Sequence, residues 1–146
     1  MTKRDIAVAV LLVVGATAGC SSSPPPVTPR PGTLVSGTAQ ISINGKDAGT
    51  TEAVQCVGAG TLTTITTGDS TSGVTAMVSN RDTLKAESVG INNVGGFTGS
   101  YNAGLGGTAK VAMIGPTYDI TGTADGFATD NPSFRTGGTF AIKVSC

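Results

Sequence analysis

The chain has 146 residues, with nine basic side chains, nine acidic side chains and no histidine. The Ser-His-Asp and Cys-His arrangements of nucleophilic catalysis are therefore excluded, because both need a histidine base. The basic residues are scattered along the sequence, whereas nucleic-acid binding needs clustered Lys and Arg. We expect a protein that is not an enzyme and that has no nucleic-acid partner.

The first 19 residues are predicted to be a secretory signal peptide. They begin with the basic pair Lys3-Arg4, continue as an apolar run from residue 6 to residue 14, and end in small residues. A membrane-spanning helix is the alternative, but it needs about 20 apolar residues. This run is shorter, and Pro24-Pro25-Pro26 prevents its extension.

Cys20 is the predicted site of lipidation. The sequence Ala18-Gly19-Cys20 resembles the lipobox of bacterial lipoproteins, in which the cysteine sulfur receives a diacylglycerol and the chain is cut just before the cysteine. Two or three acyl chains hold a protein at a membrane, because each buried methylene contributes about 0.8 kcal/mol. We expect a protein anchored by lipid to the extracytoplasmic face of the cell membrane. A secreted protein without lipid is the alternative.

Residues 20–32 are predicted to form the acylated cysteine and a disordered tether rich in Ser and Pro. Proline favours the extended polyproline II conformation, so the tether should act as a semi-rigid spacer of about 3 Å per residue. Residues 33–146 have the length of one domain. The expected organisation is therefore a signal peptide, a tether and one β-domain.

The remaining cysteines are Cys56 and Cys146. In an exported protein such a pair is expected to form one disulfide. The disulfide would close a loop of about 90 residues and contribute about 4 kcal/mol in the chain-entropy model. Two buried free thiols, or a catalytic or metal-binding pair, are the alternatives.

The β-domain is predicted to be antiparallel, as a sandwich or a partly open barrel, because short runs rich in Val, Ile and Thr alternate with Gly, Asn and Asp. Asn44-Gly45 is a strong hairpin signal, since both residues accept a positive φ. The predicted strands cover residues 39–43, 53–57, 62–66, 74–79, 84–91, 97–102, 109–114, 118–123 and 139–146.

Several glycine and aspartate clusters are predicted to be turns. The clusters 95–99 and 104–107 lack the lysine and the following helix of a phosphate loop, so hairpin turns are expected. Asp125-Gly126 and Asp130-Asn131 lack the alternating acidic ligands of a calcium loop. We expect no metal and no cofactor.

Paired carboxylates are the remaining route to acid–base catalysis. Most of them lie beside Gly, Thr, Ser or Asn, which is typical of solvated turns, so no catalytic site is predicted. The available set is Glu52, Asp69, Asp82, Glu87, Asp119, Asp125 and Asp130.

Every aromatic side chain lies in the C-terminal half of the sequence, from Phe97 onward. The N-terminal half must pack with small and branched side chains, which leaves either a thin core or a cavity. A close-packed sandwich is one interpretation, because protein interiors normally fill to high density. A cleft for a lipid or another hydrophobic ligand is the other, with Phe97, Tyr118 and Phe140 as candidate ligand-binding residues.

Five segments carry a resemblance to a known family: residues 43–47, 54–56, 87–96, 118–124 and 140–146. In order and spacing they resemble the mycobacterial 19-kilodalton lipoprotein antigen family over most of the mature domain. The resemblance implies an acylated, exported envelope protein that is recognised as an antigen and sensed by host innate lipopeptide receptors. It implies lipid on Cys20 and a disulfide between Cys56 and Cys146. The tether is shorter and richer in proline than the Thr-rich, often glycosylated tether of that family.

The leading hypothesis is a surface-displayed envelope lipoprotein that acts on a host receptor through its acylated N-terminus. The alternative is a β-domain that binds or transports a hydrophobic ligand. A subunit of a larger envelope assembly would need an exposed apolar patch, which the sequence does not reveal.

Overall fold

The computed structural model describes residues 23–25 and 28–146 of the chain. Over these residues it contains ten strands, all paired antiparallel in one nearly closed, barrel-like sheet, and one disulfide. The predicted all-β fold class is confirmed. The strands are β1 (Ala39–Ile43), β2 (Lys46–Thr51), β3 (Val54–Ala59), β4 (Leu62–Gly68), β5 (Gly73–Ser79), β6 (Lys85–Val94), β7 (Phe97–Asn102), β8 (Thr108–Ile114), β9 (Thr117–Ala128) and β10 (Arg135–Ser145).

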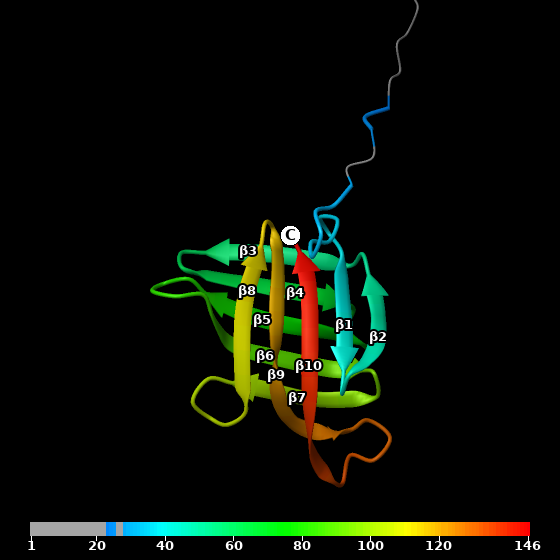
Figure 1. Cartoon of the computed structure of the whole chain (residues 1–146). Helices are drawn as coiled ribbons and strands as arrows, with labels where there is room; N and C mark the ends of the chain where they lie inside the picture. The colour runs from blue at the N-terminus through cyan, green and yellow to red at the C-terminus, as the bar shows by residue number, and fades with distance from the viewer. Residues whose placement is uncertain (1–22, 26–27) are drawn as a thin grey trace, which may run out of the picture.

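The strands form two layers that share β9. In Figure 1, strands β8, β9, β10, β1 and β2 run upright, and strands β3 to β7 cross behind them. The order is β2-β1-β10-β9-β7-β6-β5-β4-β3, and β8 also pairs with β9. The first part of β9, residues 117–123, pairs with β8, and its last part, residues 125–128, pairs with β7. Strand β9 is therefore the corner at which the sheet passes from one layer to the other.

The Asn44-Gly45 hairpin is confirmed. Both residues have positive φ, 53° and 74°, and the flanking residues Ile43 and Lys46 face each other across the β1–β2 pair. Positive φ at both central residues matches the right-handed twist of the two strands. This turn sets the register of β1, which then pairs with β10 along its whole length.

Strand β2 is not predicted by the sequence pattern, because its six residues show no apolar alternation. It is an edge strand whose residues are exposed or half-buried, so neither of its faces needs a row of apolar side chains. A bulge opposite Ile41 and Ser42 interrupts its register, and Gly49 has a φ of 118°. Strand β2 pairs with β1 because the Asn44-Gly45 turn directs the chain back alongside β1.

Strands β9 and β10 are longer than predicted, and Asp125-Gly126 lies inside β9. The prediction of a turn at this pair is therefore wrong. Gly126 is buried where β9 meets β7, and a Cβ atom there would collide with the Thr98 carbonyl oxygen. The glycine allows two backbones to approach closely, which is the other common use of glycine in strands.

Of the two glycine clusters, one forms the predicted hairpin. Gly95-Gly96 is the turn between β6 and β7. The cluster at residues 104–107 instead connects β7 to β8, which do not pair with each other within the described chain. The hairpin prediction there is wrong, because the connection crosses from one layer to the other.

The core is made of branched and small side chains from both halves of the sequence, together with a few aromatic rings. Ile65, Val74 and Val89 from the rear layer and Ile120 and Ile142 from the front layer are each at most 2% exposed. Together with the other buried apolar residues they form one continuous hydrophobic cluster. The N-terminal half therefore packs through Val, Ile and Ala.

The two buried phenylalanine rings of the core lie in spaces left by glycine. Phe97 is 3% exposed, and Cβ atoms added at Gly99 and Gly138 would lie 2.7 Å and 2.9 Å from its ring atoms. Phe140, also 3% exposed, lies over Gly122, where an added Cβ would come within 2.8 Å of the ring. The glycines supply the space that these rings occupy.

The predicted disulfide between Cys56 and Cys146 is present. Its Cα atoms are 5.9 Å apart, and the two residues are 90 positions apart in the sequence. Cys56 lies on β3, at the end of the rear layer, and Cys146 directly follows β10 in the front layer. The disulfide therefore links the free edge of one layer to the other layer.

Replacing both cysteines, Cys56→Ser with Cys146→Ser, is expected to lower the free energy of unfolding by about 4 kcal/mol, because the unfolded chain regains the entropy of a long open loop. Urea unfolding of the double variant and of the oxidised chain measures the difference. Dithiothreitol should lower the midpoint of the oxidised chain and leave that of the double variant unchanged. Equal urea midpoints for the double variant and for the oxidised wild-type chain, both without dithiothreitol, would contradict this role of the disulfide.

Gly137 and Gly138, neighbours on β10, provide a matched test of the packing around Phe97. An added Cβ at Gly138 meets the buried ring at 2.9 Å, whereas at Gly137 its nearest neighbour is the Ala124 carbonyl oxygen at 3.9 Å. Gly138→Ala is expected to destabilise the domain by about 1–3 kcal/mol through overpacking. Gly137→Ala is expected to be neutral or stabilising by about 0.5 kcal/mol. Equal destabilisation by both variants in urea unfolding would show that the Phe97 ring is not tightly enclosed.

Candidate functional site

The predicted lipid-bearing residue, Cys20, lies outside the described residues, as does the predicted signal peptide 1–19. The description is continuous from Thr28 to Cys146. No helix among the described residues is both long and apolar enough to cross a membrane. The place where the chain enters the β-domain is the part of the described fold that lies nearest in sequence to Cys20.

This entry is fixed by hydrogen bonds to two strands. The Leu34 N–H donates to the Thr117 hydroxyl oxygen at 3.0 Å, at the start of β9. The Gly37 N–H donates to the Ser145 carbonyl oxygen at 2.8 Å, and the Ser145 N–H donates to the Thr38 carbonyl oxygen at 2.9 Å, at the end of β10. Residues 34–38 therefore hold the tether to the same end of the domain as Cys146 (Figure 1).

A groove of about 520 Å³ lies at this end. One wall is the incoming chain and the other is the turn between β8 and β9, and Arg30 is the one charged residue among the described residues that line it. The lining residues are Thr28, Pro29, Arg30, Thr33, Leu34, Val35, Ser36, Gly115 and Pro116.

Large apolar side chains are exposed around this groove. Val35 is 57% exposed and Ile114, beside the turn, is 42% exposed. A Cβ added at Gly32 would lie 3.3 Å from Ile114 Cδ1, so the incoming chain and the turn are in contact. The sequence pattern does not predict this groove, although Ile114 and Pro116 on either side of Gly115 make an apolar hairpin turn.

The three candidate ligand-binding residues, Phe97, Tyr118 and Phe140, do not line the groove at the tether end. Phe97 and Phe140 are buried in the core. Tyr118, on β9, is half-buried and packs against the same core, opposite Val144 on β10 and Met113 on β8. The structure therefore places these aromatic side chains as packing elements of one hydrophobic core.

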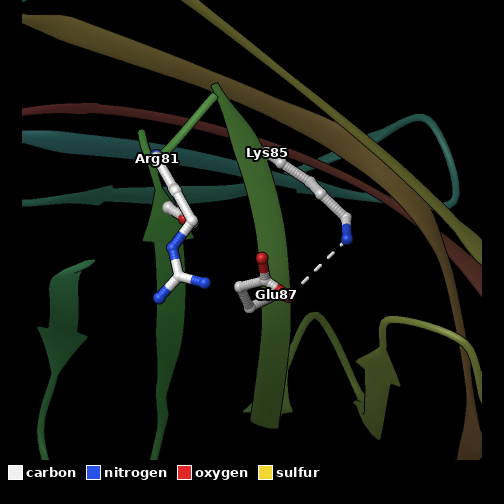
Figure 2. A network of polar contacts seen from close by, with 4 residues as sticks. Arg81, Lys85 and Glu87 are labelled. Atoms are coloured by element: carbon white, nitrogen blue, oxygen red, sulfur yellow. Dashed lines mark hydrogen bonds and ion pairs between the residues drawn. The ribbon is translucent and has the colours of Figure 1, made fainter. Parts of the chain in front are cut away.

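A second groove lies at the β5–β6 connection and is lined by charged and polar residues, among them Arg81, Asp82, Lys85 and Glu87. Figure 2 shows the Lys85 ammonium directed toward the Glu87 carboxylate, at 3.7 Å, with both side chains substantially exposed. Exposed ion pairs contribute about 0–1 kcal/mol. The two cations balance the two carboxylates, so this groove presents no strong net charge.

The candidate carboxylates are spread over separate elements. Glu87 on β6 pairs with Lys85, and Asp119 on β9 lies 3.9 Å from Lys143 on β10. No group of three or more His, Cys, Asp or Glu side chains in the described part of the chain is placed to hold a metal ion.

Asp69 caps the turn between β4 and β5. Its Oδ1 accepts hydrogen bonds from the Thr71 hydroxyl at 2.6 Å, the Thr71 N–H at 2.7 Å and the Ser72 N–H at 3.0 Å. These bonds, led by the Thr71 hydroxyl, lower the pKa of the carboxyl below its ordinary value of 3.8. Their role is structural, since they stabilise the charged form inside a turn.

The lowered pKa of Asp69 predicts a pH-dependent contribution to stability. The contribution is present above 3.8 and is lost as the pH falls through the lower folded-state pKa. Asp69→Asn is therefore expected to lower the thermal unfolding midpoint at neutral pH, with a difference that shrinks below 3.8. Asp130→Asn, in another exposed turn, is the control. A difference for Asp69→Asn that persists unchanged in acid would contradict the assignment.

Sequence comparisons identify relatives over the whole chain. A family model described as the Mycobacterium 19 kDa lipoprotein antigen matches residues 32–146. A putative lipoprotein of Mycobacterium indicus pranii is 35% identical over 147 residues, covering all of both chains. The lipoprotein LpqH of Mycobacterium avium is 36% identical over 108 residues, which cover 73% of this chain and 67% of that protein.

The lipoprotein LpqH of Mycobacterium tuberculosis strain H37Rv is 35% identical over 108 residues, covering 73% of this chain and 68% of the relative. The family match includes the whole β-sheet and both disulfide cysteines. It agrees with the resemblance seen in the sequence. The chain belongs to the mycobacterial 19 kDa lipoprotein antigen family, a family of envelope lipoproteins.

Proposed function

We propose that the protein is anchored by acyl chains on Cys20 to the extracytoplasmic face of the membrane, is displayed at the envelope surface, and engages host innate receptors through its acylated N-terminus. In this proposal the β-domain is a stable, antigenic carrier without catalytic activity. Its anchor is the lipid that the Ala18-Gly19-Cys20 sequence predicts.

The observation that carries the proposal is the filled interior of the β-domain. The rings of Phe97 and Phe140 occupy the hollows over Gly99, Gly138 and Gly122. The core packed in this way leaves no room beside these rings for a small-molecule ligand, and the apolar groove lies outside the core, at the tether end. The packing therefore favours the display hypothesis over the carriage of a hydrophobic ligand.

The chemistry of the chain supports the same choice. The sequence has no histidine, and the described carboxylates that form ion pairs do so with lysine at the surface. An acylated cysteine at the end of a short tether supplies what a lipopeptide receptor needs, namely exposed acyl chains next to a few residues of peptide. The proposal assigns receptor engagement to that terminus.

Cys20→Ala is expected to abolish acylation, membrane association and receptor signalling together, because all three depend on the same sulfur. Intact-mass measurement of the mature protein reports the acyl chains, flotation with membranes reports anchoring, and a receptor reporter cell reports signalling. Thermal unfolding should be unchanged, since Cys20 lies outside the disulfide. Ser21→Ala, the neighbouring substitution, is the control and should retain all three properties.

Two outcomes would overturn parts of this proposal. Signalling retained by a Cys20→Ala chain whose mass shows no lipid would move the receptor activity to the β-domain. A wild-type chain that carries no acyl group would remove the anchor itself.

A further inference from the structure

The end of the domain at which the tether enters carries an apolar patch that is not buried in the core. We define the tether-end patch as Pro29, Leu34, Val35, Ile114 and Pro116. All but Ile114 line the groove at this end, and Ile114 adjoins it through its contact with Gly32. Val35 and Ile114 are 57% and 42% exposed and do not belong to the buried core.

The composition of the β8–β9 turn is unusual in this protein. Most of the other hairpin turns are built from polar residues and glycine, among them Asn44-Gly45, Gly60-Thr61, Asp69 to Ser72 and Gly95-Gly96. Polar residues and glycine are the normal choice, because turns lie in water. At the β8–β9 turn, Ile114 and Pro116 flank Gly115, and Met113 beside them is 45% exposed. Clustered exposed apolar side chains mark an interaction surface.

The length of the chain between Cys20 and the domain limits how far the tether-end patch can lie from the lipid proposed on Cys20. Pro29 lies nine positions after Cys20, and a segment of nine residues spans at most about 32 Å even when fully extended. The patch lies at the end of the domain that this segment enters (Figure 1). Tethering over such a distance gives an effective concentration of the order of mM, so a weak affinity is enough for contact.

We propose that the tether-end patch rests on the lipid layer that holds the acyl chains of Cys20, with the β8–β9 turn inserted at the headgroup boundary. This inference rests on the proposed acylation. Apolar side chains bind a lipid interface through the area they bury, and a basic residue adds attraction to anionic headgroups. Arg30 is the one charged residue among the described residues that line the groove, so the apolar side chains supply most of the affinity.

The proposed orientation separates two ends of the molecule. The β7–β8 connection and the β9–β10 connection lie at the end opposite the tether (Figure 1). Their side chains Leu105 and Phe134 are 83% and 70% exposed. With the tether-end patch on the lipid, these two loops face away from the membrane and are the most accessible part of the domain.

The chain contains no tryptophan, so single substitutions provide clean fluorescent reporters of depth. Ile114→Trp places the reporter in the tether-end patch, and Leu105→Trp places an equally bulky reporter at the opposite end. Each acylated mature chain, from Cys20 to Cys146, is reconstituted into vesicles of phosphatidylcholine and phosphatidylglycerol, with and without brominated acyl chains. We expect brominated lipid to cause about a twofold loss of emission for Ile114→Trp, because interfacial residues lie about 5–10 Å into the headgroup and acyl boundary. Leu105→Trp should be unaffected.

Because tryptophan itself favours interfaces, hydrogen exchange of the unsubstituted acylated chain supplies a second reading. Amides of residues 34–36 and 113–115 should exchange more slowly on vesicles than in the unacylated chain in solution, and amides of residues 103–107 should not change. Protection of the same amides in an unacylated chain that sediments as a dimer would assign the patch to a second copy and overturn the proposal.

Flotation separates this inference from the proposed anchor. A chain that floats with the vesicles but shows equal quenching at positions 114 and 105, and no slowed exchange, is anchored without resting on its patch, which overturns this inference alone. A wild-type chain that carries no acyl group and does not float overturns both.

Discussion

The fold depends on the double use of strand β9. Its first part pairs with β8 and its last part with β7, while β10 pairs with it along most of its length. One continuous strand therefore joins the two layers and fixes the angle between them. At the corner the backbones approach so closely that Gly126 has no room for a Cβ beside the Thr98 carbonyl oxygen. The ring of Phe97, at the start of β7, fills the adjacent space over Gly138.

This corner explains how a chain with few aromatic side chains builds a complete core. The rings of Phe97, Tyr101 and Phe140 contribute large apolar areas, and the rest of the interior is filled by Val, Ile and Ala. The disulfide then joins β3, the end of the rear layer, to the end of β10. The result is a nearly closed domain whose distinctive surfaces are at its two ends, which fits the proposal that the lipid is carried on Cys20, outside the domain.

The sequence predicts much of this fold because two of its signals can be read without knowing how the strands pack. The hairpin at Asn44-Gly45 depends on two residues that accept positive φ, and both have it. The disulfide follows from the number of cysteines and from export. Strand β2 and the end of β9 are not predictable in this way, because their pairing is imposed by the neighbouring turn and by the close approach at Gly126, neither of which produces an apolar alternation. The tether-end patch is not visible in the sequence, because it forms only when the fold places the turn at Gly115 beside residues 29–35.

The central claim is that the β-domain is filled by its own side chains and therefore carries no internal hydrophobic ligand. Native mass spectrometry of the unacylated chain from Ser21 to Cys146, with the disulfide intact and after incubation with envelope lipids, tests this claim most directly. The account predicts the bare mass of the polypeptide. A reproducible added mass that extracts as lipid, and that is lost in a variant with Phe97 or Phe140 replaced by Leu, would contradict it.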